Sequence, residues 1–160
     1  LLGWVCCRVG AYILKRGLRM SDETYSGSCF CGSIKYTATG PVRNLCLCHC
    51  ESCRRAAGAP FVAWGSVDVD KFKIAVGNMS IHESSPGVER GFCKQCGCSL
   101  TYTNRLREKD IDFTLASLED PTVLAPKSQI FVVDKISWIE TNPDLPQYQT
   151  VPGAEEPDSS

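Results

Sequence analysis

Seven of the eleven cysteines in this chain lie in three tight groups, and no other feature constrains its fold as strongly. The groups are Cys29-Phe-Cys31, Cys48-His-Cys50-Glu-Ser-Cys53 and Cys93-Lys-Gln-Cys96-Gly97. A Cys-x-x-Cys turn directs two thiolates to one side of a bend, and a glycine after it lets the backbone turn tightly. Because paired thiolates at such spacings are typical zinc ligands, the sequence predicts a small fold organised around metal.

The groups differ in how many ligands they supply. Structural zinc takes four ligands in a tetrahedron, and the first and third groups together supply four: Cys29, Cys31, Cys93 and Cys96. The middle group supplies only three: Cys48, Cys50 and Cys53. Three protein ligands with an open fourth position are typical of a catalytic zinc. The sequence therefore predicts two Zn²⁺ ions per chain, one structural and one catalytic.

Other residues near the groups could complete or replace these ligand sets. His49 could close the middle site, but neighbours on an extended segment point in opposite directions, so Cys48 and Cys50 should converge while His49 diverges. In that case His49 lies in the outer shell of the site or at the surface. Cys46 and Cys98 could also act as ligands, but we expect them to pack as small apolar side chains.

Two other kinds of cysteine chemistry remain as alternatives. In the first alternative, the cysteines form disulfides or are unconnected buried thiols. A disulfide between Cys29 and Cys31, or between Cys48 and Cys50, would be geometrically awkward. An iron–sulfur cluster is the other, because all-thiolate ligation also suits iron. The colour of the purified protein would distinguish iron from zinc.

The composition predicts one folded unit, residues 22–148, between two segments of different character. Residues 1–21 lack the run of about 18 apolar residues needed to span a membrane, and their basic cluster follows the apolar part, unlike a secretory signal. We expect an extension upstream of a natural start at Met20, with a mitochondrial targeting segment as the alternative. Residues 149–160 are acidic and proline-broken, as in a disordered tail. The expected location is cytoplasmic.

Short strands separated by turn residues dominate the folded unit. Strands are expected at residues 34–39, 61–64, 72–76, 79–82, 88–92, 99–103, 111–115 and 129–133. Gly77-Asn78 is predicted to close a hairpin, and the one good helical candidate is Glu51–Ala57. The predicted fold class is mainly β, with short antiparallel strands and one short helix.

The charge balance restricts the kind of partner. With 17 Lys and Arg against 18 Asp and Glu, the formal net charge of −1 gives no field that attracts nucleic acid or an anionic membrane. We therefore expect neither as a partner, and the open position of the middle group favours an enzyme. A zinc-stabilised protein-binding module without activity is the alternative, and a fourth protein ligand in the middle group would favour it.

Three motifs together resemble those of a known family: Gly27–Gly32, Cys48–Gly58 and Phe92–Gly97. The chain resembles the glutathione-dependent formaldehyde-activating enzymes, also called S-(hydroxymethyl)glutathione synthases, over residues 22–148. The resemblance extends through residues 129–138 and 144–148, although this family often has a histidine at the position of Gln129. It implies a small zinc-binding fold of the β-tent type, which centromere protein V shares.

The resemblance also implies a reaction and its site. Cys48, Cys50 and Cys53 would hold the catalytic Zn²⁺, at which a thiol, glutathione, adds to formaldehyde or a related small aldehyde. The reverse reaction is that of a carbon–sulfur lyase, and the same chemistry on another thiol or aldehyde is the alternative. Glutathione carries two carboxylates, and the guanidinium groups of Arg54 and Arg55 suit carboxylates well. We therefore predict these two arginines as substrate-binding residues.

Overall fold

The computed structural model describes residues 23–153, which form ten strands and one α-helix. The strands are β1 (Thr24–Ser28), β2 (Lys35–Thr39), β3 (Arg43–Cys48), β4 (Val62–Asp68), β5 (Phe72–Val76), β6 (Ser80–Ser85), β7 (Val88–Phe92), β8 (Ser99–Asn104), β9 (Asp110–Thr114) and β10 (Ser128–Ile130). The helix α1 spans Glu51–Ala57, and five 3₁₀ turns cover Val69–Lys71 (η1), Arg105–Arg107 (η2), Leu115–Ser117 (η3), Pro121–Val123 (η4) and Val132–Asp134 (η5). The predicted mainly β fold with one short helix is confirmed.

Two stretches of the predicted organisation lie outside the described residues. These are the predicted N-terminal extension and residues 154–160 of the predicted acidic tail. Within residues 23–153, no helix has the length and apolar character that crossing a membrane would require.

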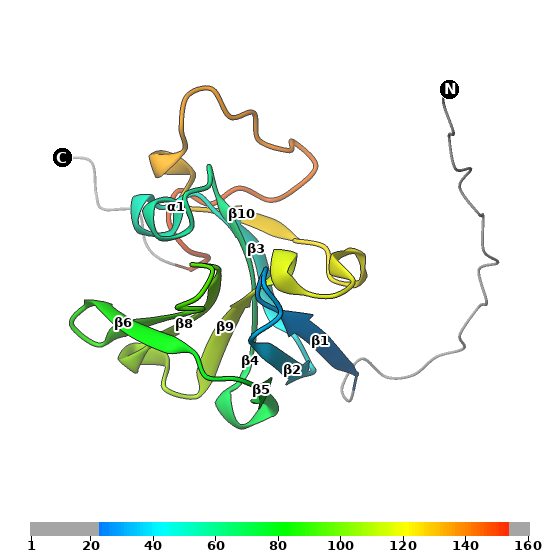
Figure 1. Ribbon diagram of the computed structural model, residues 1–160. Helices are drawn as coiled ribbons and strands as arrows, with labels where there is room; N and C mark the ends of the chain where they lie inside the picture. Colours follow the sequence, from blue (N-terminus) through cyan, green and yellow to red (C-terminus); the bar gives the residue numbers. More distant parts are fainter. Residues whose placement is uncertain (1–22, 154–160) are drawn as a thin grey trace, which may run out of the picture.

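The strands form two sheets (Figure 1). The smaller has the order β1-β2-β5, and the larger has the order β10-β3-β4-β9-β8-β7-β6. All neighbouring strands are antiparallel except β10, which runs parallel to β3. The helix α1 follows β3 directly and lies at one end of the larger sheet (Figure 1).

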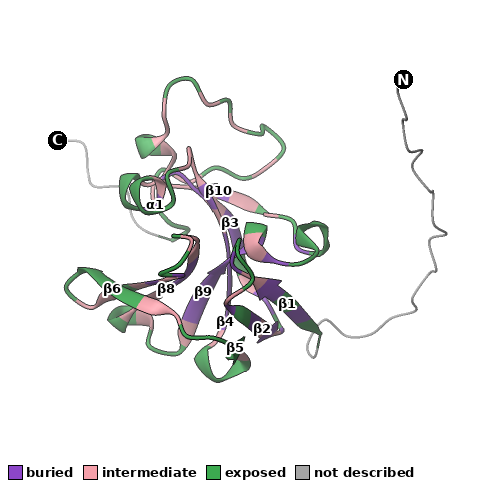
Figure 2. Cartoon of the chain, in the orientation of Figure 1, coloured by how far each residue is buried: buried purple, intermediate pink, exposed green. Residues whose placement is uncertain are grey.

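The main core combines side chains from both sheets. Along β2, Tyr36 and Ala38 are buried while Lys35 is exposed, which is the alternation expected of a strand with one covered face. The Tyr36 ring stacks on Phe72 of β5 at a centroid distance of 4.9 Å, and it contacts Phe113 of β9. Figure 2 shows the buried positions on β1, β3, β4 and β9, whereas β6 is largely exposed.

A second, smaller core lies on the other face of β3 and β4. Cys46 and Cys48 of β3 belong to it, whereas Leu45 of the same strand belongs to the main core. The same division occurs on β4, where Val62 and Trp64 face the smaller core. The period-two alternation of these strands therefore divides the cysteines of β3 from the main apolar core.

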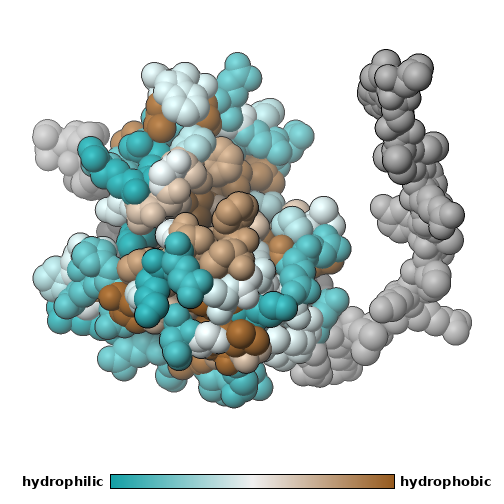
Figure 3. Space-filling view, viewed as in Figure 1, coloured by the Kyte–Doolittle hydropathy of each residue, from teal (hydrophilic) through white to brown (hydrophobic). Residues whose placement is uncertain are grey.

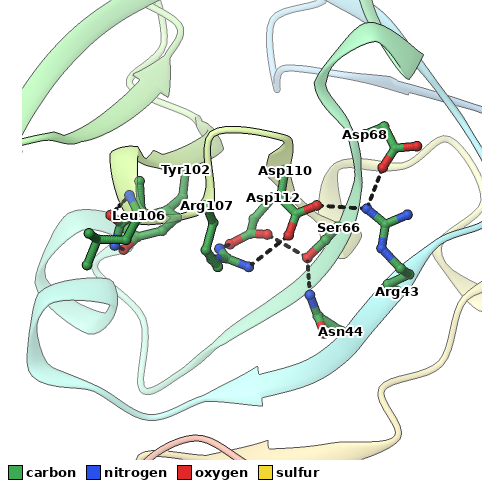
Figure 4. Close-up of polar contacts among 10 residues, drawn as sticks. Arg43, Asn44, Ser66, Asp68, Tyr102, Leu106, Arg107, Asp110 and Asp112 are labelled. Carbon is green, nitrogen blue, oxygen red and sulfur yellow. Dashed lines mark hydrogen bonds and ion pairs between the residues drawn. The ribbon is translucent and has the colours of Figure 1, made fainter.

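A polar network fixes the register of β3, β4 and β9 (Figure 4). Ser66 Oγ donates a hydrogen bond to Asp112 Oδ1 at 2.5 Å and accepts one from Asn44 Nδ2 at 3.1 Å. Arg107 forms an ion pair with the other oxygen of Asp112, a residue that is 8% exposed. Because Asp112 is buried, its carboxylate requires both of these partners.

Replacing Asp112 by alanine should lower the free energy of unfolding by about 2–3 kcal/mol, because the Arg107 charge and the Ser66 hydroxyl lose their buried acceptor. The matched control is Asp68→Ala. Asp68 also pairs with an arginine, Arg43, but its side chain is 49% exposed, so its removal should cost less than about 1 kcal/mol. Urea unfolding of both variants provides the comparison, and equal losses would contradict this account of the network.

The structure corrects the prediction at Gly77-Asn78. These residues do not close a hairpin, because β5 pairs with β2 in the smaller sheet while β6 pairs with β7 in the larger one. The chain instead crosses between sheets here. Gly77 has φ +75°, and a Cβ would lie 2.1 Å from the carbonyl oxygen of Ser33, so glycine is required for this close approach.

Other strand boundaries also differ from the sequence prediction. The strands β1 and β3 are additional, and their sequences, Thr-Tyr-Ser-Gly-Ser and Arg-Asn-Leu-Cys-Leu-Cys, contain few β-branched residues. The strand predicted at 129–133 ends early, at Ile130. Phe131 adopts the left-handed conformation (φ +54°), which ends the strand, and η5 follows.

Candidate metal centres

The first cluster joins two turns that are far apart in the chain. Cys31 in one turn and Cys93 in the other are separated by 62 positions in the sequence. The Sγ atoms of its four members lie within 4.8 Å of one another: Cys29, Cys31, Cys93 and Cys96. The Sγ–Sγ distance is 3.6 Å for Cys29–Cys31 and 3.8 Å for Cys31–Cys93. A tetrahedron with zinc–sulfur bonds of about 2.3 Å has edges of about 3.8 Å, so the four thiols fit a metal of this kind.

In both turns, the glycine that follows the second cysteine donates its N–H to the carbonyl of the first cysteine. After β1, Gly32 N donates to Cys29 O at 2.9 Å, and after β7, Gly97 N donates to Cys93 O at 2.8 Å. Gly32 and Gly97 have positive φ angles of +74° and +75°, which glycine adopts without steric cost. The glycine after each cysteine pair thus closes the bend that brings the thiols together.

Hydrogen bonds lower the pKa of two thiols in the first cluster, Cys29 and Cys93. Burial raises the pKa of Cys29, but hydrogen bonds from the Ser33 hydroxyl and the Ile34 N–H outweigh it and lower the pKa to about 6. Ser33 Oγ also lies 3.3 Å from the Sγ atom of Cys93. A thiol that ionises readily is a ready metal ligand, because the thiolate is the form that binds.

The second cluster lies where β3 passes into α1. Its three Sγ atoms also lie within 4.8 Å of one another: Cys48, Cys50 and Cys53. Cys48 ends β3, Cys50 caps α1, and its Sγ accepts a hydrogen bond from Cys53 N at 3.3 Å. Contacts with Cys48 and Cys50 lower the pKa of Cys53, and the guanidinium group of Arg90 adds to this effect.

The three thiols lie against an apolar wall. Val62, Trp64 and Cys46 are buried beside them, while Tyr102 and Phe131 pack against them from the rim. Figure 3 shows a group of tan, moderately apolar side chains near the middle of the face of the molecule that it presents. This composition is that of a small-molecule site, in which apolar side chains surround a few chemically active groups.

His49 does not join the three thiols, although it stands between two of them in the chain. Its side chain is fully buried on another side of the segment, where Nε2 lies 3.3 Å from Gln129 Oε1 and the ring packs near Phe61. Gln129 in turn donates from Nε2 to the carbonyl of Asn142 at 2.9 Å. The predicted divergence of His49 from the cysteines is confirmed, and its surface alternative is wrong.

The other cysteines of the described residues also stay outside both clusters. Cys46 is buried in the smaller core, and Cys98 is half-buried against the main core, as the packing prediction requires. All nine cysteines among residues 23–153 are free thiols. No described histidine, aspartate or glutamate supplies a fourth ligand to the second cluster.

Arg54 and Arg55 project from α1 in different ways. Arg54 Nε donates to the backbone carbonyl of His49 at 3.0 Å, and Arg55 forms an exposed ion pair with Glu51 at 2.7 Å. The described contacts therefore bring a different arginine to the thiols. Arg90 of β7 places Nη1 3.7 Å from the Sγ atom of Cys53, a contact between residues 37 positions apart that no local sequence motif indicates.

The fold and the two thiol clusters define a mainly β protein with one complete and one three-ligand centre, each of which could hold a metal ion. The sequence profile of the glutathione-dependent formaldehyde-activating enzymes matches residues 24–134. The chain belongs to this family, so the resemblance seen in the sequence is confirmed.

Individual relatives agree with this placement. An uncharacterized lyase of Schizosaccharomyces pombe is 37% identical over 82 residues, which are 50% of this chain and 59% of that protein. A protein of Phaeosphaeria nodorum, provisionally named glutathione-dependent formaldehyde-activating enzyme, is 29% identical over 68% of this chain and 62% of its own length. The chain thus spans about three fifths of these curated relatives. A crystal structure of a Rhodobacter sphaeroides protein is similar with a TM-score of 0.48 and 23% identity, over 62% of this chain and 94% of that one.

Proposed function

We propose that this protein is a carbon–sulfur lyase that joins glutathione to formaldehyde, and that it can also run the reaction in reverse. The observation that carries the proposal is the convergence of Cys48, Cys50 and Cys53 without a fourth ligand from the described residues. Membership of the family and the name of the fission-yeast relative, a lyase, support the reaction class.

We further propose that each thiol cluster holds one Zn²⁺ ion. The first cluster, with four thiols, would be a structural centre, and the second would leave a position for substrate. When bound in the second cluster, Zn²⁺ would supply the charge that keeps a thiol in its nucleophilic thiolate form at neutral pH. The proposed location is the cytoplasm, because a reducing compartment keeps such thiols free.

The proposed reaction needs few groups from the protein. The thiol sulfur forms a bond to the carbonyl carbon, the π electrons of the C=O bond move to oxygen, and the proton lost by the thiol ends on that oxygen. The product is S-hydroxymethylglutathione. Trp64 and Phe131 pack beside the three thiols, so they would reduce the access of water to the reacting sulfur, and the fixed thiols would help to orient that sulfur. Arg54 and Arg55 remain proposed contacts for the substrate carboxylates.

Exchange spectroscopy by NMR tests the proposal, because glutathione and formaldehyde also combine spontaneously. With zinc-loaded protein, we expect the exchange rate between free and adduct glutathione to rise in proportion to protein concentration. If the rate stays at its spontaneous value, the proposal is wrong and the non-catalytic binding module takes its place. Acceleration with another thiol or aldehyde alone would overturn the assignment of the substrates.

A further inference from the structure

Arg90 is held beside the second cluster by contacts with three different elements. Its Nη1 lies 3.7 Å from the Sγ atom of Cys53 in α1, and its Nε donates to Ser84 Oγ of β6 at 3.2 Å. Its guanidinium carbon lies 5.0 Å above the ring of Tyr102 in β8, within cation–π distance. These contacts fix a side chain that is otherwise long and mobile.

Tyr102, on which Arg90 packs, is itself held in place by neighbouring side chains. The Tyr102 ring packs at a tilt against Trp64, which is buried in the wall of the cluster, with 6.2 Å between centroids. The Tyr102 hydroxyl accepts a hydrogen bond from Asn104 Nδ2 at 3.2 Å. Arg90 also pairs with Tyr102 in the register of β7 and β8, so the strand pairing itself places the guanidinium over the ring.

The guanidinium group retains donors that the protein does not use. Nε and Nη1 have partners, whereas Nη2 makes no hydrogen bond within residues 23–153. Arg54 and Arg55 likewise direct Nε to a protein oxygen, so unused donors alone do not distinguish Arg90 from them. Among the described cations, Arg90 is the one whose hydrogen bond reaches a sulfur of the second cluster.

We propose that Arg90 binds a carboxylate of the incoming thiol, so that the second cluster selects thiols that carry a carboxylate. This inference rests on the proposed function. A guanidinium presents paired N–H donors that match a carboxylate, and Nη2 lies on the group that touches Cys53. Because its position is fixed before the substrate arrives, little ordering is needed on binding.

Two thiols of nearly equal shape isolate the effect: 3-mercaptopropionate and its neutral analogue 3-mercaptopropionamide. Calorimetry measures the binding of each to the zinc-loaded protein. We expect the unaltered protein to bind the acid about tenfold or more tightly than the amide, as a hydrogen bond to a charged group predicts. In Arg90→Met this preference should disappear, whereas Arg90→Lys should retain part of it.

The ratio of the two affinities separates recognition from a structural role, because a distorted site would weaken both thiols together. The control Arg105→Met removes an exposed guanidinium on η2 and should leave the ratio unchanged. If Arg90→Met fails to fold, Ser84→Ala serves as the second variant, since it removes only the Nε partner and should reduce the ratio.

The outcomes distinguish this inference from the proposed function. If neither thiol binds the unaltered zinc-loaded protein, the second cluster is not a thiol site and the proposed function is wrong. If both thiols bind, but the acid has no advantage or keeps its full advantage in Arg90→Met, only the role of Arg90 is overturned.

Discussion

Cys93→Ser should leave the protein unfolded at 25 °C. Cys93 belongs to the turn after β7 in the larger sheet, whereas Cys29 and Cys31 follow β1 in the smaller sheet, so the first cluster ties the two sheets together. Zinc binding by structural sites contributes about 10–16 kcal/mol, which is comparable to or larger than the whole stability of a domain, about 5–15 kcal/mol. Circular dichroism and a zinc assay on the purified variant would show this loss.

The matched control for this prediction is Cys98→Ala. Cys98 lies two residues beyond Cys96 and packs against the main core, but it does not belong to the cluster. Its truncation should change the free energy of unfolding by about 1 kcal/mol and leave the zinc content intact. A Cys93→Ser protein with the thermal midpoint of the unaltered chain would show that the first cluster does not hold the fold together.

Cys53→Ala should have the opposite profile, with the fold kept and the activity lost. Cys53 lies in α1 and is buried in the smaller core, so its truncation leaves the main core and the first cluster untouched. One of two zinc ions should be lost. Catalysis should fall by more than about a hundredfold, because removing even an outer partner of a metal ligand costs about 10–100-fold. Zinc content and the NMR exchange rate are the two measurements.

Cys46→Ala provides the comparison within the same core. Cys46 is buried two residues before Cys48 but does not belong to the second cluster. This variant should keep both zinc ions and most of the exchange activity. Loss of one zinc ion from Cys46→Ala, with full retention in Cys53→Ala, would show that the ligand set is wrong.

The sequence predicts the cysteine clusters well because their geometry is local. Cys48, Cys50 and Cys53 fall within one strand end and one helical turn, so their spacing alone brings the thiols together. The same holds within each half of the first cluster, where a glycine closes the bend. The prediction that the two halves share one metal ion followed from the four ligands that structural zinc takes.

The surroundings of the second cluster could not be predicted in this way. Arg90 reaches Cys53 only because β7 pairs with β8 and the larger sheet brings β8 beside the smaller core. No short window of sequence contains that information. The error at Gly77-Asn78 has a related cause, because the same turn residues can close a hairpin or carry the chain from one sheet to another. Long-range pairing decides between these outcomes.

The open position at Cys48, Cys50 and Cys53 is tested most directly by ¹¹³Cd NMR of the cadmium-substituted protein. We expect two resonances, one for each cluster, and glutathione should shift only the resonance of the three-thiol cluster, because the four-thiol cluster is already complete. The Cys53→Ala spectrum assigns that resonance by its absence. If glutathione leaves both resonances in place, the second cluster is closed to thiols, and the account of this protein as a thiol-binding lyase is contradicted.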